Sequence, residues 1–275
     1  MRQTAFDHSF GTEWDHLLVA ERQGYSTSVA DYHRHNFYEI NLILSGNVKI
    51  LLGDSSEEGC ENRLVLTRPG TPHYITCRPD TLYHRLYLLF TDDLVAGYLP
   101  EWGQFSTVFG ENGTVLTLTR EQTALFQRQL LQIREEQSLF RQRLMIYDLL
   151  SRIYEQKDDD KPRQQAIPSY ILHALTYLDE HCGERIVAAD LAALLHVGRT
   201  TLMTEFKRHL GTTVTAYLTH CRLRRAETLL QNGYSVESAA AHCGFSDTSG
   251  LVRAFKRCYG RPPRAYLAQK KAKAL

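Results

Sequence analysis

The chain has 275 residues, of which 43% are hydrophobic and 23% are charged. These are the proportions of an ordinary globular protein, and the length is sufficient for two domains with separate cores. The formal net charge of +1 excludes no class of partner by itself. However, residues 166–275 contain 15 Lys and Arg against 8 Asp and Glu, whereas residues 1–165 contain 17 against 23. A basic C-terminal part is typical of a chain that binds phosphates at that end.

The six cysteines are scattered and form no C-x-x-C pair. This usage is typical of a reducing compartment and argues against a disulfide framework or a zinc ribbon. The first 16 residues contain no basic segment followed by an apolar one, so we expect no signal peptide. Apolar runs such as residues 86–90 are too short to cross a bilayer. We therefore expect a cytoplasmic protein that does not enter a membrane.

Short segments rich in Leu, Ile, Val and Tyr predict strands in the N-terminal part. They cover residues 17–25, 37–45, 48–52, 64–67, 74–77, 84–90 and 114–118. Turn-forming residues separate most of them, for example Gly46 with Asn47 and Pro69 with Gly70. Many short strands at this spacing predict a β-sandwich or a small barrel.

Residues 119–154 change to a helical pattern. Thr119 and Gln122 form a capping-box signature. Apolar residues then recur at helical spacing, at Phe126, Leu130, Ile133, Phe140, Leu144, Tyr147, Leu150 and Tyr154. Residues 135–138 are expected to divide this segment into two helices. These helices form either a lid or dimer face, or a cover over the open side of their own domain.

Residues 155–168 are charged, contain two prolines and have almost no large apolar side chains, which predicts a linker. We therefore expect a domain at residues 1–154, a linker at 155–168 and a helical domain at 169–275.

The helical domain contains one pattern twice. Residues 200–218 and 249–267 align without gaps and share Leu, Phe-Lys-Arg, Gly and Ala-Tyr-Leu at matching places. Each copy completes a predicted helix-turn-helix, with helices at 188–195 and 199–209 in the first unit and at 236–242 and 247–258 in the second. Upstream of the turns the offset falls from 49 to 48, so the second turn has one extra residue. A long helix at 213–231 is expected to fix the separation of the two units.

The second helix of each unit is expected to present its outward face to a major groove of DNA. Leu202 and Phe206, like Leu251 and Phe255, lie four residues apart and should face the core. The outward residues are then Thr200, Met203, Thr204 and Lys207 in the first unit, and Thr248, Ser249, Val252, Arg253 and Lys256 in the second. At the helix ends we expect phosphate contacts from Lys207, Arg208, Lys256 and Arg257. The alternative is that helix dipoles alone favour these cations.

The doubled helix-turn-helix, the two Phe-Lys-Arg sequences and the closing G-x-P-P-x-x-Y of residues 260–266 resemble the AraC-type transcription regulators over residues 169–268. The resemblance implies double-stranded DNA as partner, at an asymmetric promoter site. It also implies a homodimer, and contact with RNA polymerase if the protein is an activator, which we favour. Carried over by position, the base-reading residues are Thr200, Met203 and Thr204, then Thr248, Ser249 and Arg253.

Three residues depart from the family pattern. Thr204 stands where arginine is common, Gly250 stands where a larger residue is usual, and His196 replaces a turn glycine. Without that arginine the first unit lacks its best bidentate donor for guanine. We expect it to contribute mainly phosphate contacts.

Residues 33–39, HRHNFYE, together with Gly46 resemble the H-x-H-x-x-x-E-x6-G pattern of cupin barrels, and residues 69–73 resemble the second cupin motif. Cys77 departs from that motif, which has asparagine there. Alternate residues of a strand share a face, so His33 and His35 should point together. With His73 and Glu39 they offer three imidazoles and a carboxylate, a set that suits Zn, Ni, Fe or Mn.

A second interpretation needs no metal. AraC-type sensor domains share the cupin barrel, and their interior binds a sugar or another small effector. In that case His33, His35, Glu39 and His73 hydrogen-bond the effector, and Tyr38 offers an aromatic face with a hydroxyl tip. A third interpretation is a pocket that binds nothing.

Together these features predict a multidomain α and β protein. Its N-terminal domain is a cupin-like β-barrel with two appended helices, and its C-terminal all-α domain has two helix-turn-helix units joined by a long helix. We favour a sequence-specific transcription regulator controlled by a small effector, and not an enzyme, because the sequence shows no nucleophile–base pair or phosphate loop. The alternative is a cupin metalloenzyme or metal sensor with an accessory DNA-binding domain.

Overall fold

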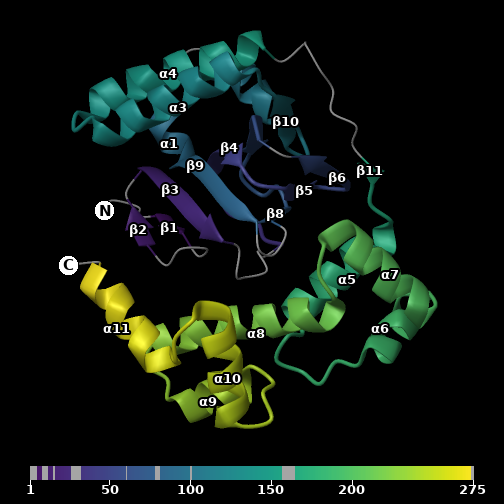
Figure 1. The fold of residues 1–275 in the computed structure, drawn as a ribbon. Helices are drawn as coiled ribbons and strands as arrows, with labels where there is room; N and C mark the ends of the chain where they lie inside the picture. Colours follow the sequence, from purple (N-terminus) through teal and green to yellow (C-terminus); the bar gives the residue numbers. More distant parts are fainter. Residues whose placement is uncertain are drawn as a thin grey trace. The chain divides into compact units, whose positions relative to one another are not determined.

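The computed structural model describes residues 5–7, 12–14, 16–25, 32–59, 61–77, 81–99, 101–156 and 165–273. They form two compact units, the first ending at Ala166 and the second beginning at Ile167. Figure 1 shows a first unit built on strands and a second built on helices alone. Within the described ranges, no helix is long and apolar enough to span a membrane.

Two antiparallel sheets form the first unit (Figure 1). The larger sheet contains, in spatial order, β10 (Thr114–Thr117), β7 (Arg63–Thr67), β4 (Tyr38–Ser45), β9 (Leu82–Phe90) and β3 (Leu17–Tyr25). The smaller contains β11 (Gln165–Ala166), β6 (Ser55–Gly59), β5 (Val48–Leu52) and β8 (His73–Cys77). A separate pair joins β1 (Ala5–Asp7) to β2 (Thr12–Trp14).

The sheet-rich first unit and the helical second unit are confirmed, but the barrel expected from the sequence is not closed. Among the described residues no ladder joins the two sheets, and only an isolated bridge between His33 and His73 links the segment before β4 to β8. Strand number and length are similar in an open and a closed arrangement, and only the pairing of the edge strands distinguishes them. The sequence therefore could not settle this point.

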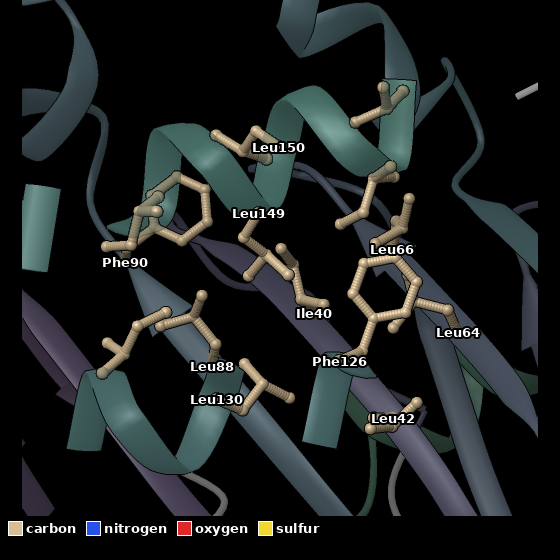
Figure 2. Packing of buried hydrophobic residues seen from close by; sticks show 14 of the residues in the cluster. Ile40, Leu42, Leu64, Leu66, Leu88, Phe90, Phe126, Leu130, Leu149 and Leu150 are labelled. Carbon is tan, nitrogen blue, oxygen red and sulfur yellow. The ribbon is translucent and has the colours of Figure 1, made fainter. Parts of the chain in front are cut away.

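Two helices cover the outer face of the larger sheet. They are α3 (Arg120–Glu135) and α4 (Leu139–Glu155), and Figure 2 shows Phe126, Leu130 and Leu149 from these helices packed against residues of the sheet such as Ile40 and Leu88. Strand residues on the opposite face of the larger sheet, such as Ile43 and Val65, form a second apolar cluster with the smaller sheet. Because both faces are covered, the central strands are apolar at most positions.

The predicted capping box at the start of α3 is confirmed. The Gln122 amide nitrogen donates to Thr119 Oγ1 at 3.1 Å, and the Thr119 amide nitrogen donates to Gln122 Oε1 at 2.7 Å.

Short helices α1 (Asp92–Val95), α2 (Trp102–Phe105) and η1 (Ser106–Phe109) connect β9 to β10.

The first turns of α4 leave an apolar surface exposed. Phe140 is 67% exposed, Leu144 is 49% exposed and Leu139 is 40% exposed. The residues of α4 that enter the core lie further along, at Ile146, Leu149, Leu150 and Ile153. The apolar spacing of this segment therefore predicted a helix correctly, although two of its positions, Phe140 and Leu144, face outward.

Seven helices form the second unit, within the described residues. They are α5 (Ser169–Glu180), α6 (Ala188–Leu194), α7 (Arg199–Leu210), α8 (Val214–Gln231), α9 (Val236–His242), α10 (Thr248–Tyr259) and α11 (Pro263–Lys273). Helices α6 and α7 form the first helix-turn-helix, and α9 and α10 form the second. The predicted long helix is α8, which packs on the second helix-turn-helix through Leu223, Ala226 and Leu230.

The segment expected to be a linker lies largely outside the described residues, at positions 157–164. At its start, α4 continues to Glu155. At its end, Gln165 and Ala166 pair with β6, and Pro168 immediately precedes α5.

Candidate DNA-binding surface and candidate effector site

The two helix-turn-helix units share one turn geometry. The Val197 amide donates to the Ala192 carbonyl at 3.0 Å, and the Phe245 amide donates to the Ala240 carbonyl at 3.1 Å. The residue before each donor has left-handed backbone, with φ of +54° at His196 and +71° at Gly244. Both pairs of equivalent residues are 48 positions apart, so the predicted offset upstream of the turns is confirmed.

The extra residue of the second turn leads to an N-terminal cap on α10 that α7, in the first helix-turn-helix, lacks. Asp247 accepts a hydrogen bond from the Gly250 amide at 2.6 Å, whereas Gly198 precedes α7 without a side-chain cap. This hydrogen bond lowers the pKa of the Asp247 carboxyl, so the cap stays charged near neutral pH. A charged cap at an N-terminus stabilises α10.

The structure places the candidate DNA-binding residues outside the core of the second unit. Leu202 and Phe206, and likewise Leu251 and Phe255, are fully buried and turn the opposite helix faces outward. The exposed candidates are Thr200, Thr204, Lys207, Arg208, Ser249, Arg253, Lys256 and Arg257. Met203, Thr248 and Val252 are half-buried at the margins of these faces.

The basic residues of the two faces differ in their partners. Arg208 is held by Glu205 one turn earlier, with Nε donating to Oε1 at 3.1 Å. The same pairing lowers the pKa of the Glu205 carboxyl, so this carboxylate compensates the charge of Arg208. No carboxylate forms a salt bridge with Lys207 or Arg253 in the part of the chain that the structure describes. Their charges are therefore better available to an anionic partner.

A close backbone contact attaches the second turn to the loop between α5 and α6. A Cβ added at Gly244 would lie 2.7 Å from the Gly183 carbonyl oxygen, and one added at Gly183 would lie 2.8 Å from the His242 carbonyl oxygen. Beside it, Arg222 of α8 donates from Nε to the Cys182 carbonyl at 2.8 Å and from Nη2 to the Glu184 carbonyl at 2.7 Å. We call this arrangement the Gly183–Gly244 contact. The sequence showed Gly244 as a turn residue only, because nothing in it indicates what lies against the turn.

In the first unit, the four candidate metal or effector residues come together. Glu39 lies in β4 and His73 in β8, and His33 and His35 precede β4. The backbone amide of each of His33 and His73 donates to the carbonyl of the other, at 3.0 and 2.9 Å. One ligand atom from each of the four residues lies within 4.8 Å of the others.

Glu39 is the centre of this cluster. His35 Nε2 and His73 Nε2 each lie 3.0 Å from Glu39 Oε2. Burial alone would raise the pKa of Glu39, but the hydrogen bonds to His35 and His73 outweigh it and hold that pKa well below its usual range. The buried group is therefore a carboxylate.

The orientation of two imidazoles is fixed by backbone carbonyls. His35 Nδ1 lies 2.9 Å from the Phe37 carbonyl oxygen, and His73 Nδ1 lies 2.9 Å from the Thr71 carbonyl oxygen. These contacts hold both rings with Nδ1 towards the backbone and Nε2 towards Glu39.

Tyr38 does not join the cluster. It lies on the opposite face of β4, where its ring packs 5.1 Å from Phe90 and 4.8 Å from Phe109, measured between centroids. Its hydroxyl donates to Asp92 at 3.4 Å, and burial, with Asp92 nearby, raises the pKa of Tyr38 to about 12. Adjacent residues of a strand face opposite ways, so Glu39, which follows Tyr38, reaches the cluster and Tyr38 does not.

The sequence reasoning missed the polar residues that continue the cluster along the inner face of the larger sheet. Asn41 is fully buried and accepts a hydrogen bond from Arg85 Nη1 at 2.8 Å, and Arg85 lies 5.0 Å from the Tyr87 ring centroid. Thr67 is paired with Glu39 in the sheet register. Asn41 Nδ2 and Thr67 Oγ1 are buried and have no hydrogen-bond partner among the described residues. The available signal was a lone asparagine inside an apolar strand.

Two units, one with paired helix-turn-helix motifs and one with a buried polar site, define a ligand-binding DNA-binding protein. Two family models match the chain: the AraC-like ligand binding domain at residues 16–174 and a helix-turn-helix domain at residues 191–269. The chain belongs to the AraC-type family of transcription regulators. Its helix-turn-helix domain binds DNA, and its N-terminal domain binds a small-molecule effector.

The chain is also similar to proteins of known name. The chain is 24% identical to the probable transcriptional regulator LumQ of Photobacterium leiognathi, over 86% of this chain and 91% of LumQ. It is 22% identical to the HTH-type transcriptional activator RhaR of Mannheimia succiniciproducens, over 94% of each chain. Among solved structures, ToxT of Vibrio cholerae is 13% identical, with a TM-score of 0.41 over 92% of this chain and 98% of ToxT.

Proposed function

We propose that this chain binds an asymmetric double-stranded DNA site with α7 and α10, under the control of an effector bound between the two sheets. The observation that carries the proposal is the pair of turns with equal backbone geometry and different outward residues. Residues 1–154 then serve effector binding and dimerisation, 155–168 are the linker, and 169–275 bind DNA.

Base reading is assigned mainly to α10. Arg253 is exposed, carries five donors in a planar fork and suits a guanine edge, with Thr248 and Ser249 beside it. The matching face of α7 offers Thr200, Met203 and Thr204, which form weaker or less directional contacts. Phosphate contacts are assigned to Lys207, Arg208, Lys256 and Arg257.

Selection of duplexes from a random library with the full-length protein tests this function. We expect enrichment of one site with two unlike elements whose centres lie about one helical turn apart, since two helices of one chain then enter successive major grooves. A single short element or no enrichment would contradict the proposal.

Lys207→Ala should weaken binding to all duplexes alike. Because Lys207 is assigned a phosphate contact, we expect the slope of log K against log salt to become less steep by about 0.9. Binding titrations at several salt concentrations measure the slope. Arg128→Ala, which removes an exposed positive charge from α3 of the other unit, is the matched control and should leave the slope unchanged. An unchanged slope in Lys207→Ala would remove this residue from the DNA surface.

For the effector, we propose a small molecule rich in oxygen atoms, such as a sugar. His33, His35, Glu39 and His73 provide hydrogen-bonding groups at one end of the inner face, and Asn41 and Thr67 extend them. Buried polar atoms without a partner in the protein are commonly satisfied by a ligand or by water. Thermal shift measurements with a panel of sugars and other polyols search for this effector.

We propose that the chain forms a homodimer through the exposed start of α4. A two-fold contact buries the same apolar patch, Leu139, Phe140 and Leu144, on both copies and requires no other partner. Phe140→Glu should therefore weaken dimerisation at least about 10-fold in sedimentation equilibrium. Leu82→Glu, at another exposed apolar position (46% exposed), is the control and should not. A wild-type monomer, or equal effects of the two variants, would contradict this interface.

We further propose a cytoplasmic activator that contacts RNA polymerase and performs no catalysis of its own. Relatives named as regulators, one of them as an activator, support this assignment. Transcription in vitro from a template that carries the selected site, with and without the protein, distinguishes activation from repression. Recovery of the effector unchanged after incubation tests the absence of catalysis.

A further inference from the structure

We propose that the effector of this chain is a sugar acid or a similar hydroxycarboxylate, and that Arg85 and Arg22 bind its carboxylate on the inner face of the larger sheet. The inference rests on the proposed function in one respect, namely that an effector binds between the two sheets. It adds the charge of that effector and the residues that recognise the charge.

Arg85 lies on the inner face of the larger sheet. In β9, Leu86 and Leu88 belong to the apolar core under α3 and α4, so the alternate residues Arg85 and Tyr87 face the other way. Arg85 is only 9% exposed, and burial of a guanidinium is costly unless polar groups or an anion compensate it. Its Nη1 donates to Asn41 Oδ1 at 2.8 Å, and its Cζ lies 5.0 Å from the Tyr87 ring centroid. These two contacts are with neutral groups.

A second arginine lies directly beside Arg85. Arg22 of β3 is the register partner of Arg85 across the antiparallel ladder. Opposed residues of such a ladder point to the same face, with Cβ atoms about 5 Å apart. Two positive charges in this arrangement repel each other, and an anion bound by both would offset the repulsion. Arg22 is exposed, so this end of the face is in reach of solvent.

Tyr83 adds a hydrogen-bond donor to the two guanidinium groups. It lies two positions before Arg85 on β9, on the same face, and its buried hydroxyl has no hydrogen-bond partner among the described residues. Burial raises the pKa of Tyr83, and Arg85 and Arg22 are both close enough to oppose that rise. The hydroxyl therefore keeps its proton near neutral pH and can donate it to an anionic oxygen.

A carboxylate suits this place better than a phosphate group. The planar fork of Arg85 matches the two oxygen atoms of a carboxylate. Glu39 lies on the same face as an ionised carboxylate, and its charge also acts on the Tyr83 hydroxyl. It therefore repels a phosphate group, with a charge of about −1.5 to −2, more strongly than a carboxylate with a single charge.

The neutral part of the effector is expected to lie between Arg85 and Glu39. Asn41 accepts from Arg85 through Oδ1, and its Nδ2 has no partner among the described residues. Thr67, the register partner of Glu39, likewise has an unpartnered hydroxyl there. Asn41 and Glu39 are two residues apart, or about 7 Å along the strand, and a sugar acid of about six carbons covers that distance. Its hydroxyl groups would satisfy both buried side chains.

Isothermal titration calorimetry of the full-length protein, with acids and neutral molecules of similar size, tests the proposal. D-gluconate is compared with D-glucitol, D-glucuronate with D-glucose, and D-galacturonate with D-galactose, so that each pair differs mainly in the carboxylate. D-glucose 6-phosphate is the phosphate probe. We expect at least one acid to bind about 10-fold or more tightly than its neutral partner, because charge-assisted hydrogen bonds are stronger than neutral ones.

Variants of the two arginines locate the carboxylate. Arg85→Gln should weaken binding of the acid about 10- to 100-fold and leave binding of its neutral partner nearly unchanged. Arg22→Ala, at an exposed position, should weaken it about 3- to 5-fold. The control is Arg134→Gln, because Arg134 is an exposed arginine of α3 whose Nη1 bonds Glu21 on the opposite face of β3. It should bind the acid as the wild type does.

Melting followed by the fluorescence of Trp14 and Trp102, which both belong to the strand-built first unit, shows whether each variant is folded. If Arg85→Gln does not melt cooperatively, Arg22→Ala decides alone, since substitution of an exposed side chain has little effect on folding.

Equal affinity for the acids and their neutral partners would overturn the proposal. So would tighter binding of D-glucose 6-phosphate than of every acid, or no binding of any acid at about 10 mM. Unchanged binding of the acid in the folded arginine variants would also overturn it. The DNA site is selected and measured without these molecules, and binding of neutral sugars would leave the proposed effector site intact. A failure of this inference is therefore distinguishable from a failure of the proposed function.

Discussion

Replacing Gly244 by alanine should destabilise the helical domain, which begins at Ile167, by about 3 kcal/mol or more and abolish specific DNA binding. The backbone at this position is left-handed, with φ of +71°, which alone disfavours alanine by about 1–2 kcal/mol. The added Cβ would also lie 2.7 Å from the Gly183 carbonyl oxygen and 3.0 Å from its carbon. These are backbone atoms, which cannot turn away as the end of a side chain can, so the turn or the loop must move.

Gly260→Ala is the matched control. Gly260 ends α10 with φ of +72°, and a Cβ there meets no atom within 4 Å. Its expected effect is the conformational term alone, about 1–2 kcal/mol. Urea unfolding followed by circular dichroism measures the stability of both variants. The fluorescence of Trp14 and Trp102, which both lie in the strand-built domain, should not change. Equal effects of the two substitutions would show that the Gly183–Gly244 contact contributes nothing.

Arg253→Ala should reduce affinity for the selected site about 10- to 100-fold and relax preference at one base pair. Arg253 is exposed on the outward face of α10, and among the described residues it forms no salt bridge. A bidentate contact to guanine discriminates strongly against other bases. A panel of duplexes with single substitutions locates the affected position.

Thr204→Ala, at the matching place of α7 in the first helix-turn-helix, is the comparison for this prediction. It should change affinity only a few-fold, since threonine offers one hydroxyl where arginine offers a fork. Should Arg253→Ala lower affinity for every duplex equally, Arg253 contacts a phosphate and the assignment of base reading to α10 is wrong.

Local signals explain why much of the fold could be predicted. Gly211 and Gly260 end α7 and α10 with left-handed backbone, so the repeat contained the helix boundaries directly. The central strands of the larger sheet, β4, β7 and β9, were recognisable because both of their faces are buried. By contrast, β6 was missed, since its sequence SSEEG pairs through backbone atoms and has no apolar signal.

The limits of the prediction lie where distant segments meet. Alternation along β4 separates Tyr38 from Glu39, and only a reliable strand phase could have assigned Tyr38 to the helix-covered face. Asn41 and Thr67 became candidates once the sheet register placed them beside the cluster. Similarly, the importance of Gly183 depends on which segment lies against it, and one sequence gives no information on that partner.

The Gly183–Gly244 contact has a consequence for the promoters that this regulator recognises. Two reading helices held by α8, and by backbone packed against backbone, have little freedom to follow insertions or deletions between their DNA elements. Half a helical turn of additional DNA would rotate one element to the opposite side of the duplex. Over evolution, target promoters can therefore exchange single bases more easily than they can change the length between them.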